Sequence, residues 1–206
     1  MNKKLIVSPH VDDDVLGCGG ILDSDSLVLY CGLDETGIED RPSEEVRLKE
    51  INDVVKLTKH KYKILDNPVN RYKKHDLIGE FEKVINDYKP DEIYLPHPSY
   101  NQDHVEVYES SMVALRPHDL NYFVKKVFVY EQPHMLFWDN NGVDFKPNYF
   151  VPIDIEKKIR VYTLMESQVR SFRSPDHIKA IGKLRGGQSD CDYAEAFKIL
   201  RWVNEE

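Results

Sequence analysis

Cysteine is scarce in this sequence. The 206 residues include three cysteines, Cys18, Cys31 and Cys191, and none of them belongs to a C-x-x-C pair. An odd number of widely spaced thiols argues against a disulfide framework and against a thiolate zinc site. We therefore expect all three thiols to be unpaired, as is usual in cytoplasmic proteins.

Long hydrophobic runs are also missing. No segment approaches the roughly 18 apolar residues that a membrane-crossing helix needs. The apolar run at 5–7 follows two lysines but is broken at 8–10, which makes it shorter than the roughly 7–15 apolar residues of a signal peptide. The sequence therefore predicts a β-strand here, and a cytoplasmic protein without a membrane span.

Positive charge is in deficit. Lys and Arg number 28 against 36 Asp and Glu, which gives a formal net charge of −8. Binding nucleic acid through its phosphates requires clustered Lys and Arg, so we expect no nucleic-acid partner. The expected partner is a small molecule, and apolar patches could still support a homo-oligomer.

The sequence does contain a regular alternation of strand and helix patterns. Short apolar runs predict strands at 5–8, 27–31, 62–65, 92–95 and 127–130, and longer stretches predict helices at 42–59, 77–88, 105–115, 155–172 and 191–203. A long loop rich in Pro, Asn, Gly and aromatics is expected at 132–149. Strands that alternate with helices predict an α/β fold with a mainly parallel sheet flanked by helices. Since no repeat, low-complexity tract or linker interrupts it, we expect a single domain over residues 1–206.

Two segments that follow predicted strands are dense in metal-ligand side chains. They are residues 8–14, which include His10 and Asp13, and residues 97–104, which carry a histidine at each end. In open α/β sheets, binding sites lie at the carboxyl ends of the strands. A His and a carboxylate from one loop with a His from the other would leave a fourth position open, as in catalytic zinc sites. Iron, manganese or cobalt would also suit this set of ligands.

A purely structural reading of the first segment stays open. Asp12, Asp13 and Asp14 could cap the following helix and complement its dipole. Three adjacent carboxylates repel one another, however, and a bound cation would relieve that repulsion. The nearby glycines fall as G-x-G-G, which is a weak match to the G-x-G-x-x-G dinucleotide loop.

The two segments resemble the motifs of a known family. Residues 9–14 (PHVDDD) resemble the P-H-P-D-D-E signature of the GlcNAc-phosphatidylinositol deacetylases, also called the LmbE-like or PIG-L family. Residues 101–104 (NQDH) resemble its second motif. Further segments common in bacterial members lie at 130–133, 150–154, 166–168 and 193–197, so the resemblance extends over nearly the whole chain.

The resemblance implies a fold, an activity and a set of site residues. The implied fold is a Rossmann-like α/β domain, and the implied activity is N-deacetylation of an amino sugar or related small molecule. Zinc would be held by His10, Asp13 and His104, with Asp12 as the general base. Asp103, next to His104, would accept a hydrogen bond from that ligand or orient it, and a helix cap before Val105 is an equal alternative. Arg47 corresponds to an arginine at a comparable place in family members. It could contact a substrate hydroxyl or phosphate, and a solvated position on its helix is equally consistent with the sequence.

The chain departs from the family pattern at three positions. Val11 replaces a proline and Asp14 replaces a glutamate, which changes the stiffness and support of the loop. Asn101 stands where many members have a histidine that polarises the substrate. An asparagine amide can donate a hydrogen bond but cannot transfer a proton, so that task falls to Asp12 or to another group such as His97.

The remaining polar candidates are assigned structural roles. Arg185 is expected to pin a loop, and the histidines at 60, 75, 118, 134 and 177 are expected at the surface or in packing. Trp138 and its aromatic neighbours could form either a sugar-binding wall or part of the core.

Two other functions fit the sequence. One is a metal-dependent amidase or deformylase that acts on a non-sugar substrate, because the motifs describe the metal and not the acyl group. The other is a non-catalytic Rossmann-type nucleotide-binding module, which would bind nucleotide and no zinc. The metal content and the effect of Asp12→Asn separate the second reading from a hydrolase.

Overall fold

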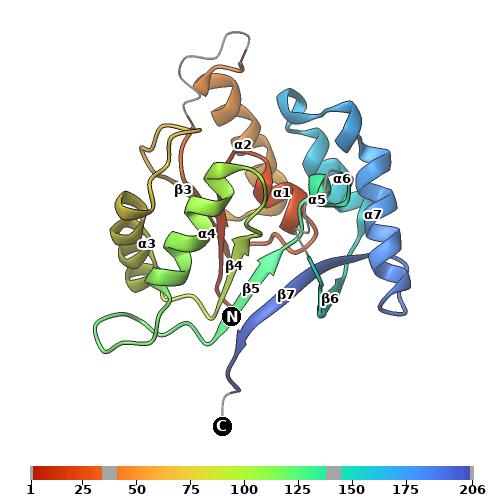
Figure 1. The fold of residues 1–206 in the computed structure, drawn as a ribbon. Helices are drawn as coiled ribbons and strands as arrows, with labels where there is room; N and C mark the ends of the chain where they lie inside the picture. The colour runs from red at the N-terminus through yellow and green to blue at the C-terminus, as the bar shows by residue number, and fades with distance from the viewer. Residues whose placement is uncertain (1, 34–40, 138–144, 205–206) are drawn as a thin grey trace.

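The fold is an alternation of strands and helices around one sheet (Figure 1). The structure is a computed structural model, and it describes residues 2–33, 41–137 and 145–204. In chain order the elements are β1 (Lys4–Ser8), α1 (Asp13–Cys18), β2 (Ser26–Tyr30), α2 (Glu44–Thr58), β3 (Lys61–Ile64), α3 (Lys74–Tyr88), β4 (Glu92–Pro96), α4 (Gln102–Ala114), β5 (Lys126–Tyr130), α5 (Pro133–Phe137), β6 (Tyr149–Pro152), α6 (Ile155–Thr163), the 3-10 turns η1 (Glu166–Gln168) and η2 (Ser171–Arg173), α7 (Pro175–Gly187) and β7 (Ala194–Trp202).

In the described part of the chain, seven strands form one sheet in the order β3-β2-β1-β4-β5-β7-β6. The first five strands pair in parallel, and β7 pairs antiparallel with both β5 and β6. From β1 the chain builds outward to β2 and β3, then returns to place β4 on the other side of β1. This reversal creates a switch point at the carboxyl ends of β1 and β4, where α/β folds bind their ligands. The predicted single-domain α/β fold with a mainly parallel sheet is confirmed.

Helices cover both faces of the sheet. In Figure 1, α3 and α4 lie on one side, and α1, α2, α6 and α7 lie on the other. Successive residues of a strand point to opposite faces, so Leu5 and Val7 pack in the core under α3 and α4, whereas Ile6 packs in the core under α1 and α2. Burial on both faces explains why the central strands are continuous apolar runs. Among the described residues, no helix is both long enough and apolar enough to span a membrane.

The prediction of a helix at 191–203 is wrong, because this segment contains strand β7 (Ala194–Trp202). Its Ala-Glu-Ala-Phe-Lys-Ile-Leu composition favours a helix locally. In the fold, however, it is hydrogen-bonded on both sides, with Phe197 opposite both Tyr130 of β5 and Tyr149 of β6. Ala194 and Phe197 are almost fully buried. Pairing with two distant strands overrides the local propensity.

The helix predicted at 155–172 ends early, at Thr163. The chain then makes the two 3-10 turns η1 and η2. Tertiary hydrogen bonds hold this bend: the backbone N–H and the hydroxyl of Ser167 donate to the carboxylate of Glu50, at 2.6 and 2.7 Å. The Tyr162 hydroxyl donates to the carbonyl of Arg173 at 2.8 Å. A periodicity argument cannot detect these contacts, because their partners lie elsewhere in the chain.

The segment predicted as a loop at 132–149 is partly regular. It contains the short helix α5 and opens into β6 at Tyr149. Trp138, considered above for a sugar-binding wall, lies outside the described residues.

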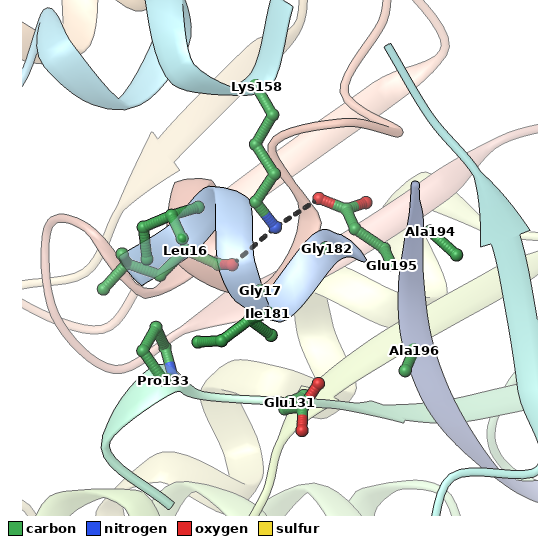
Figure 2. Close-up of a pocket in the computed structure, with 11 residues that line it drawn as sticks. Leu16, Gly17, Glu131, Pro133, Lys158, Ile181, Gly182, Ala194, Glu195 and Ala196 are labelled. Carbon is green, nitrogen blue, oxygen red and sulfur yellow. Dashed lines mark hydrogen bonds and ion pairs between the residues drawn. The ribbon is translucent and has the colours of Figure 1, made fainter. Parts of the chain in front are cut away.

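A buried ion pair ties α1 to β7. Figure 2 shows the Lys158 ammonium between the carboxylate of Glu195 and the carbonyl oxygen of Leu16. The two distances are 2.6 and 2.7 Å, and both charged residues are buried. Glu195 also accepts a hydrogen bond from the backbone of Gly20 at 2.7 Å. Lys158 therefore satisfies the C-terminal end of the short helix that carries the acidic loop, where a cation is favoured.

We expect Lys158→Met to lower the free energy of unfolding by about 3–5 kcal/mol, because it leaves the Glu195 carboxylate buried without its cation. Urea unfolding followed by circular dichroism measures this loss. The matched control is Lys183→Met, which removes an exposed lysine paired with Asp192 at 3.4 Å and should cost about 0–1 kcal/mol. Equal stability of the two variants would show that the buried pair does not hold α1.

Candidate metal and active site

The two sequence motifs meet at the switch point of the sheet. Strand β1 ends at Ser8, and the chain turns through His10 into α1. Strand β4 ends at Pro96, and a short loop leads into α4, whose first turn carries His104. The Tyr72 hydroxyl supports the first loop by donating to the carbonyl of Pro9 at 2.8 Å. The fold therefore brings residues about ninety positions apart into one site.

His10, Asp13 and His104 form a compact cluster. Their ligand atoms all lie within 4.8 Å of one another. Oδ2 of Asp13 is 3.2 Å from Nδ1 of His10 and 3.2 Å from Nε2 of His104. Ligands bound tetrahedrally to zinc at about 2.0–2.2 Å are themselves about 3.3 Å apart, so the cluster fits a divalent metal. Two imidazoles and one carboxylate match the ligand sets of catalytic metal sites.

Asp103 supports the cluster from behind. Its Oδ2 accepts hydrogen bonds from Nε2 of His10 at 3.1 Å and from the backbone N–H of Asn70 at 2.6 Å. With Nε2 engaged in this way, His10 presents Nδ1 to the cluster. This carboxylate–histidine arrangement is the usual support of metal-binding histidines. The helix-cap alternative for Asp103 is wrong, because the cap of α4 is Asn101, whose Oδ1 accepts the N–H of Asp103 at 2.9 Å.

The cluster stabilises positive charge. Burial disfavours the charged form of His10, yet its hydrogen bonds to Asp103 and Asp13 raise its pKa to about 10. Burial alone would raise the pKa of Asp13, but the charge of His104 and the hydrogen bonds with both imidazoles hold it well below its usual range. The site therefore keeps the Asp13 carboxylate ionised and favours a positive charge beside it, which are conditions that suit a bound metal ion.

Asp12 lies beside the cluster and pairs with an arginine. Its Oδ2 is 2.8 Å from Nη2 of Arg173. Burial raises the pKa of Asp12, and the charge of Arg173 opposes this shift without cancelling it. Asp12 makes no side-chain cap hydrogen bond to α1, so the capping interpretation does not explain this residue. The arginine comes from η2, a segment in which no sequence pattern indicates a role at the site.

Asp14 has a structural role. It is fully buried, and it accepts a hydrogen bond from the Tyr30 hydroxyl at 3.0 Å. Its backbone N–H donates to the hydroxyl of Ser8 at 3.1 Å. Burial raises the pKa of Asp14 to about 7. The shorter side chain at this position therefore still fastens the acidic loop to β1 and β2.

A cleft of about 340 Å³ opens above the cluster. His134 of α5 lines this cleft, and its ring centroid is 5.6 Å from that of His104. Its Nε2 is buried with no hydrogen-bond partner among the described residues. Burial, together with the nearby charge of His104, lowers the pKa of His134 to about 4, so the imidazole is neutral at neutral pH. The sequence predicts only a packing or surface role for His134, because nothing in its local pattern distinguishes it from the other lone histidines.

Of the three remaining candidates from the sequence, only one is among the described residues that line the cleft. Asn101 lines the cleft. Arg47 is buried in α2, and its charge acts on Asp12 from a distance. His97 is buried, and its ring packs edge-on against Phe145 at 5.4 Å. It is not among the residues that line the cleft in the described structure.

The remaining assignments largely agree with the sequence-based expectations. Arg185 is buried and pairs with Glu131 after β5, with Nε 2.9 Å from Oε2, which is a loop-pinning contact. His60 is buried against the Thr58 hydroxyl, and His75 is exposed.

The chain belongs to the GlcNAc-PI de-N-acetylase (PIG-L) family, whose model matches residues 5–115. This range contains both motifs. No curated protein sequence matches the chain.

Solved structures share the fold across the whole chain. The conserved protein TT1542 from Thermus thermophilus has 22% identity and a TM-score of 0.80, covering 100% of this chain and 98% of that one. The N,N'-diacetylchitobiose deacetylase from Pyrococcus horikoshii has 19% identity and a TM-score of 0.80, covering 97% and 84%. The 4-carboxy-2-hydroxymuconate hydratase from Pseudomonas putida has 18% identity and a TM-score of 0.75, covering 100% and 99%. Since this last protein is a hydratase, the fold alone does not define the reaction, and the reaction must be argued from the site.

We expect Asp103→Asn to weaken metal binding by about 10–100-fold, because the hydrogen bond that orients His10 is weakened. Competition with a chromophoric chelator measures the affinity. The matched control is Asp76→Asn, whose carboxylate is exposed beside His75; it should bind metal as the wild type does. Unchanged affinity in Asp103→Asn would mean that His10 needs no support.

Proposed function

We propose that this chain is a zinc-dependent N-deacetylase that hydrolyses the N-acyl amide of an amino sugar or a related small molecule, such as a sugar nucleotide or glycoconjugate. The observation that carries the proposal is the cluster of His10, Asp13 and His104 with the carboxylate of Asp12 beside it. Membership of a de-N-acetylase family supports the same reaction.

The three clustered residues would hold the metal. When bound, a divalent cation supplies Lewis acidity toward water and toward the acyl carbonyl. Two nitrogen ligands and one oxygen ligand suit zinc and also tolerate iron, manganese or cobalt. Asp103 fixes the orientation of His10 and therefore the shape of the site.

Asp12 is the proposed general base. A carboxylate with a raised pKa accepts a proton more readily than an ordinary one and can return it as an acid. Asp12 would take the proton of the attacking water and then deliver it to the nitrogen of the departing amine. Arg173, 2.8 Å away, fixes the position of this carboxylate. The C–N bond breaks, and the products are a carboxylate and a free amine.

His134 takes over the task of the histidine that Asn101 replaces. As a neutral imidazole on the cleft wall beside His104, it would donate a hydrogen bond to the acyl oxygen as negative charge develops there. A donor placed in advance stabilises that charge without reorganisation. In this proposal Asn101 retains the family position but serves mainly as the cap of α4.

The test is metal analysis coupled to amine release. We expect about one zinc per chain, amine release from N-acetylglucosamine derivatives, loss of release with a chelator, and recovery on adding zinc. A parallel panel of N-formyl sugars and non-sugar amides identifies the acyl group and the substrate class. A protein that binds nucleotide, retains no metal and releases no amine from any substrate would overturn the proposal.

A further inference from the structure

The 3-10 turn η1 places a buried carboxamide at the wall of the cleft. Its three residues form one of the segments that resemble bacterial family members, and the proposed function gives them no role. Gln168 lines the cleft with only 6% of its surface exposed. Burying an amide without hydrogen bonds is costly, so the neighbours of Gln168 determine how this side chain is used.

A relay of three side chains decides which way the amide points. The Ser167 hydroxyl donates its one proton to Oε2 of Glu50 at 2.7 Å. Toward Gln168 the hydroxyl oxygen can therefore only accept, and it accepts from Nε2 at 2.8 Å. The two ends of a carboxamide are alike in shape, so this order of donors and acceptors is what fixes the amide with its nitrogen toward Ser167.

The relay is anchored on both sides. Glu50 is buried on α2, and its carboxylate also accepts the backbone N–H of Ser167 at 2.6 Å. The Tyr162 hydroxyl donates to the backbone carbonyl of Gln168 at 3.3 Å. The N–H of Gln168 donates to the carbonyl of Met165 at 2.8 Å. The amide is thus held before a ligand arrives, and little freedom is lost on binding.

The oxygen of the Gln168 amide remains available to a ligand. Within residues 2–33, 41–137 and 145–204, no group donates to Oε1, and Oε1 is not one of the buried polar atoms that lack a partner. Since Gln168 lines the cleft, this oxygen is reached from the cleft. A carboxamide oxygen accepts hydrogen bonds and donates none. It matches a hydroxyl or an N–H group of a ligand.

The partner of this acceptor is a group other than the reacting amide. In the proposed function the acyl amide lies at the metal cluster, with its nitrogen toward Asp12. The donors that remain on an amino sugar are its hydroxyl groups. A site that is built to hydrogen-bond a hydroxyl rejects an analogue that lacks it, because the acceptor is then left unpaired.

We propose that Gln168 selects the substrate by accepting a hydrogen bond from one of its hydroxyl groups through Oε1, and that Glu50 and Ser167 hold the amide in the orientation this contact needs. This proposal rests on the proposed function, and it adds a specificity-determining residue to the same site.

The test removes the donor from the substrate and the acceptor from the protein. Amine release is measured from methyl N-acetylglucosaminide and from its 3-, 4- and 6-deoxyfluoro analogues, because fluorine replaces a hydroxyl without donating a hydrogen bond. In the wild type, kcat/KM should be roughly five- to a hundredfold lower for at least one analogue. In Gln168→Met, one such analogue should be hydrolysed almost as well as the parent glycoside. Equal kcat/KM for all four glycosides in the wild type, or an undiminished loss for every analogue in Gln168→Met, would overturn the proposal.

Ser167→Ala tests the relay separately. It removes the hydroxyl but keeps the backbone N–H that binds Glu50, so η1 keeps its position. Nothing then decides the direction of the amide, and the discrimination between the parent glycoside and the analogue should fall here too, with the metal content unchanged. A merely structural role would lower kcat/KM by the same factor for both glycosides, and that result would refute the relay.

Gln188→Met is the matched control. Gln188 is an exposed glutamine at the C-terminal end of α7, and its Oε1 accepts a hydrogen bond from Nη1 of Arg185 at 2.7 Å. It is not among the described residues that line the cleft, so its substitution should leave the discrimination unchanged. Circular dichroism establishes that all three variants are folded.

A binding measurement keeps this contact separate from the catalysis. If no amine is released, binding of the same four glycosides is measured by ligand-observed NMR titration. Weaker binding of one analogue by the wild type, but not by Gln168→Met, would support the contact while the deacetylase proposal fails. Equal binding of all four glycosides, or no binding of any, would overturn the contact as well. Amine release without discrimination among the glycosides would leave the deacetylase proposal intact and refute this one.

Discussion

An Asp12→Asn variant should retain its metal and lose at least a hundredfold in kcat. Asparagine has almost the same shape as aspartate and can still accept a hydrogen bond from Arg173, so the cleft keeps its geometry. It cannot accept a proton from water, and general acid–base catalysis by a placed side chain contributes typically about 10²–10⁴-fold. Metal analysis and amine-release kinetics on the same preparation measure both parts of this expectation.

The control for this variant is Asp190→Asn. Asp190 is exposed and has a positive φ of 55°, a conformation that asparagine tolerates as well as aspartate. Its substitution should change neither metal content nor turnover. If Asp12→Asn retained full activity, Asp12 would not be the base, and another group would have to accept the proton.

His104→Ala should abolish metal binding and, with it, turnover. The cluster would keep two protein ligands, His10 and Asp13. The loss of affinity should exceed the roughly 10–100-fold expected from loss of a supporting carboxylate. Elemental analysis after dialysis against a defined zinc concentration measures it, and the kinetic assay should show no amine release above background.

Two comparisons make the His104 result specific. His75→Ala removes a histidine whose side chain is 98% exposed, and it should bind metal normally. Because His104 is buried, thermal unfolding of the metal-free proteins identifies any damage to the fold itself. A folded His104→Ala protein that still binds one zinc per chain would exclude the proposed ligand set.

The N-terminal half of the chain could be predicted from the sequence because the signals for its strands and motifs are local. Apolar runs such as 5–8 and 92–95 give the buried strands, and the family motifs follow each of them directly. The carboxyl ends of parallel strands meet at one edge of a sheet, so the encounter of His10 with His104 follows from topology. From the sequence, Asp103 either orients His104 or caps the helix that follows. In the structure Asn101 caps α4, and the imidazole that Asp103 contacts is that of His10 and not that of His104.

The second half could not be predicted as well, because its structure depends on distant partners. Segment 191–203 has helical composition, yet it forms a strand between two others. Helix α6 stops at Thr163 because Ser167 binds Glu50 far back in the chain. Arg170, Arg173 and His134 carry no local motif, and only the folded chain brings them to the cleft. The resemblance pointed to segments 130–133 and 166–168, which adjoin them, without assigning any of the three a role.

Strand β7 lies between β5 and β6, and this arrangement affects how the sequence can diverge in evolution. Pro152 and Ala194 face each other across these antiparallel strands, so the chain between them departs from and returns to points about 5 Å apart. The exposed parts of an excursion anchored in this way can lengthen, shorten or exchange side chains, while the buried faces of α6 and α7 keep the sheet covered. Arg170 and Arg173 of the cleft wall belong to this excursion, whereas the imidazoles and carboxylates of the cluster do not. Selectivity for new compounds can therefore evolve in the exposed parts of this excursion, whereas Arg173, which pairs with Asp12, and Lys158, which holds α1, limit what can change there.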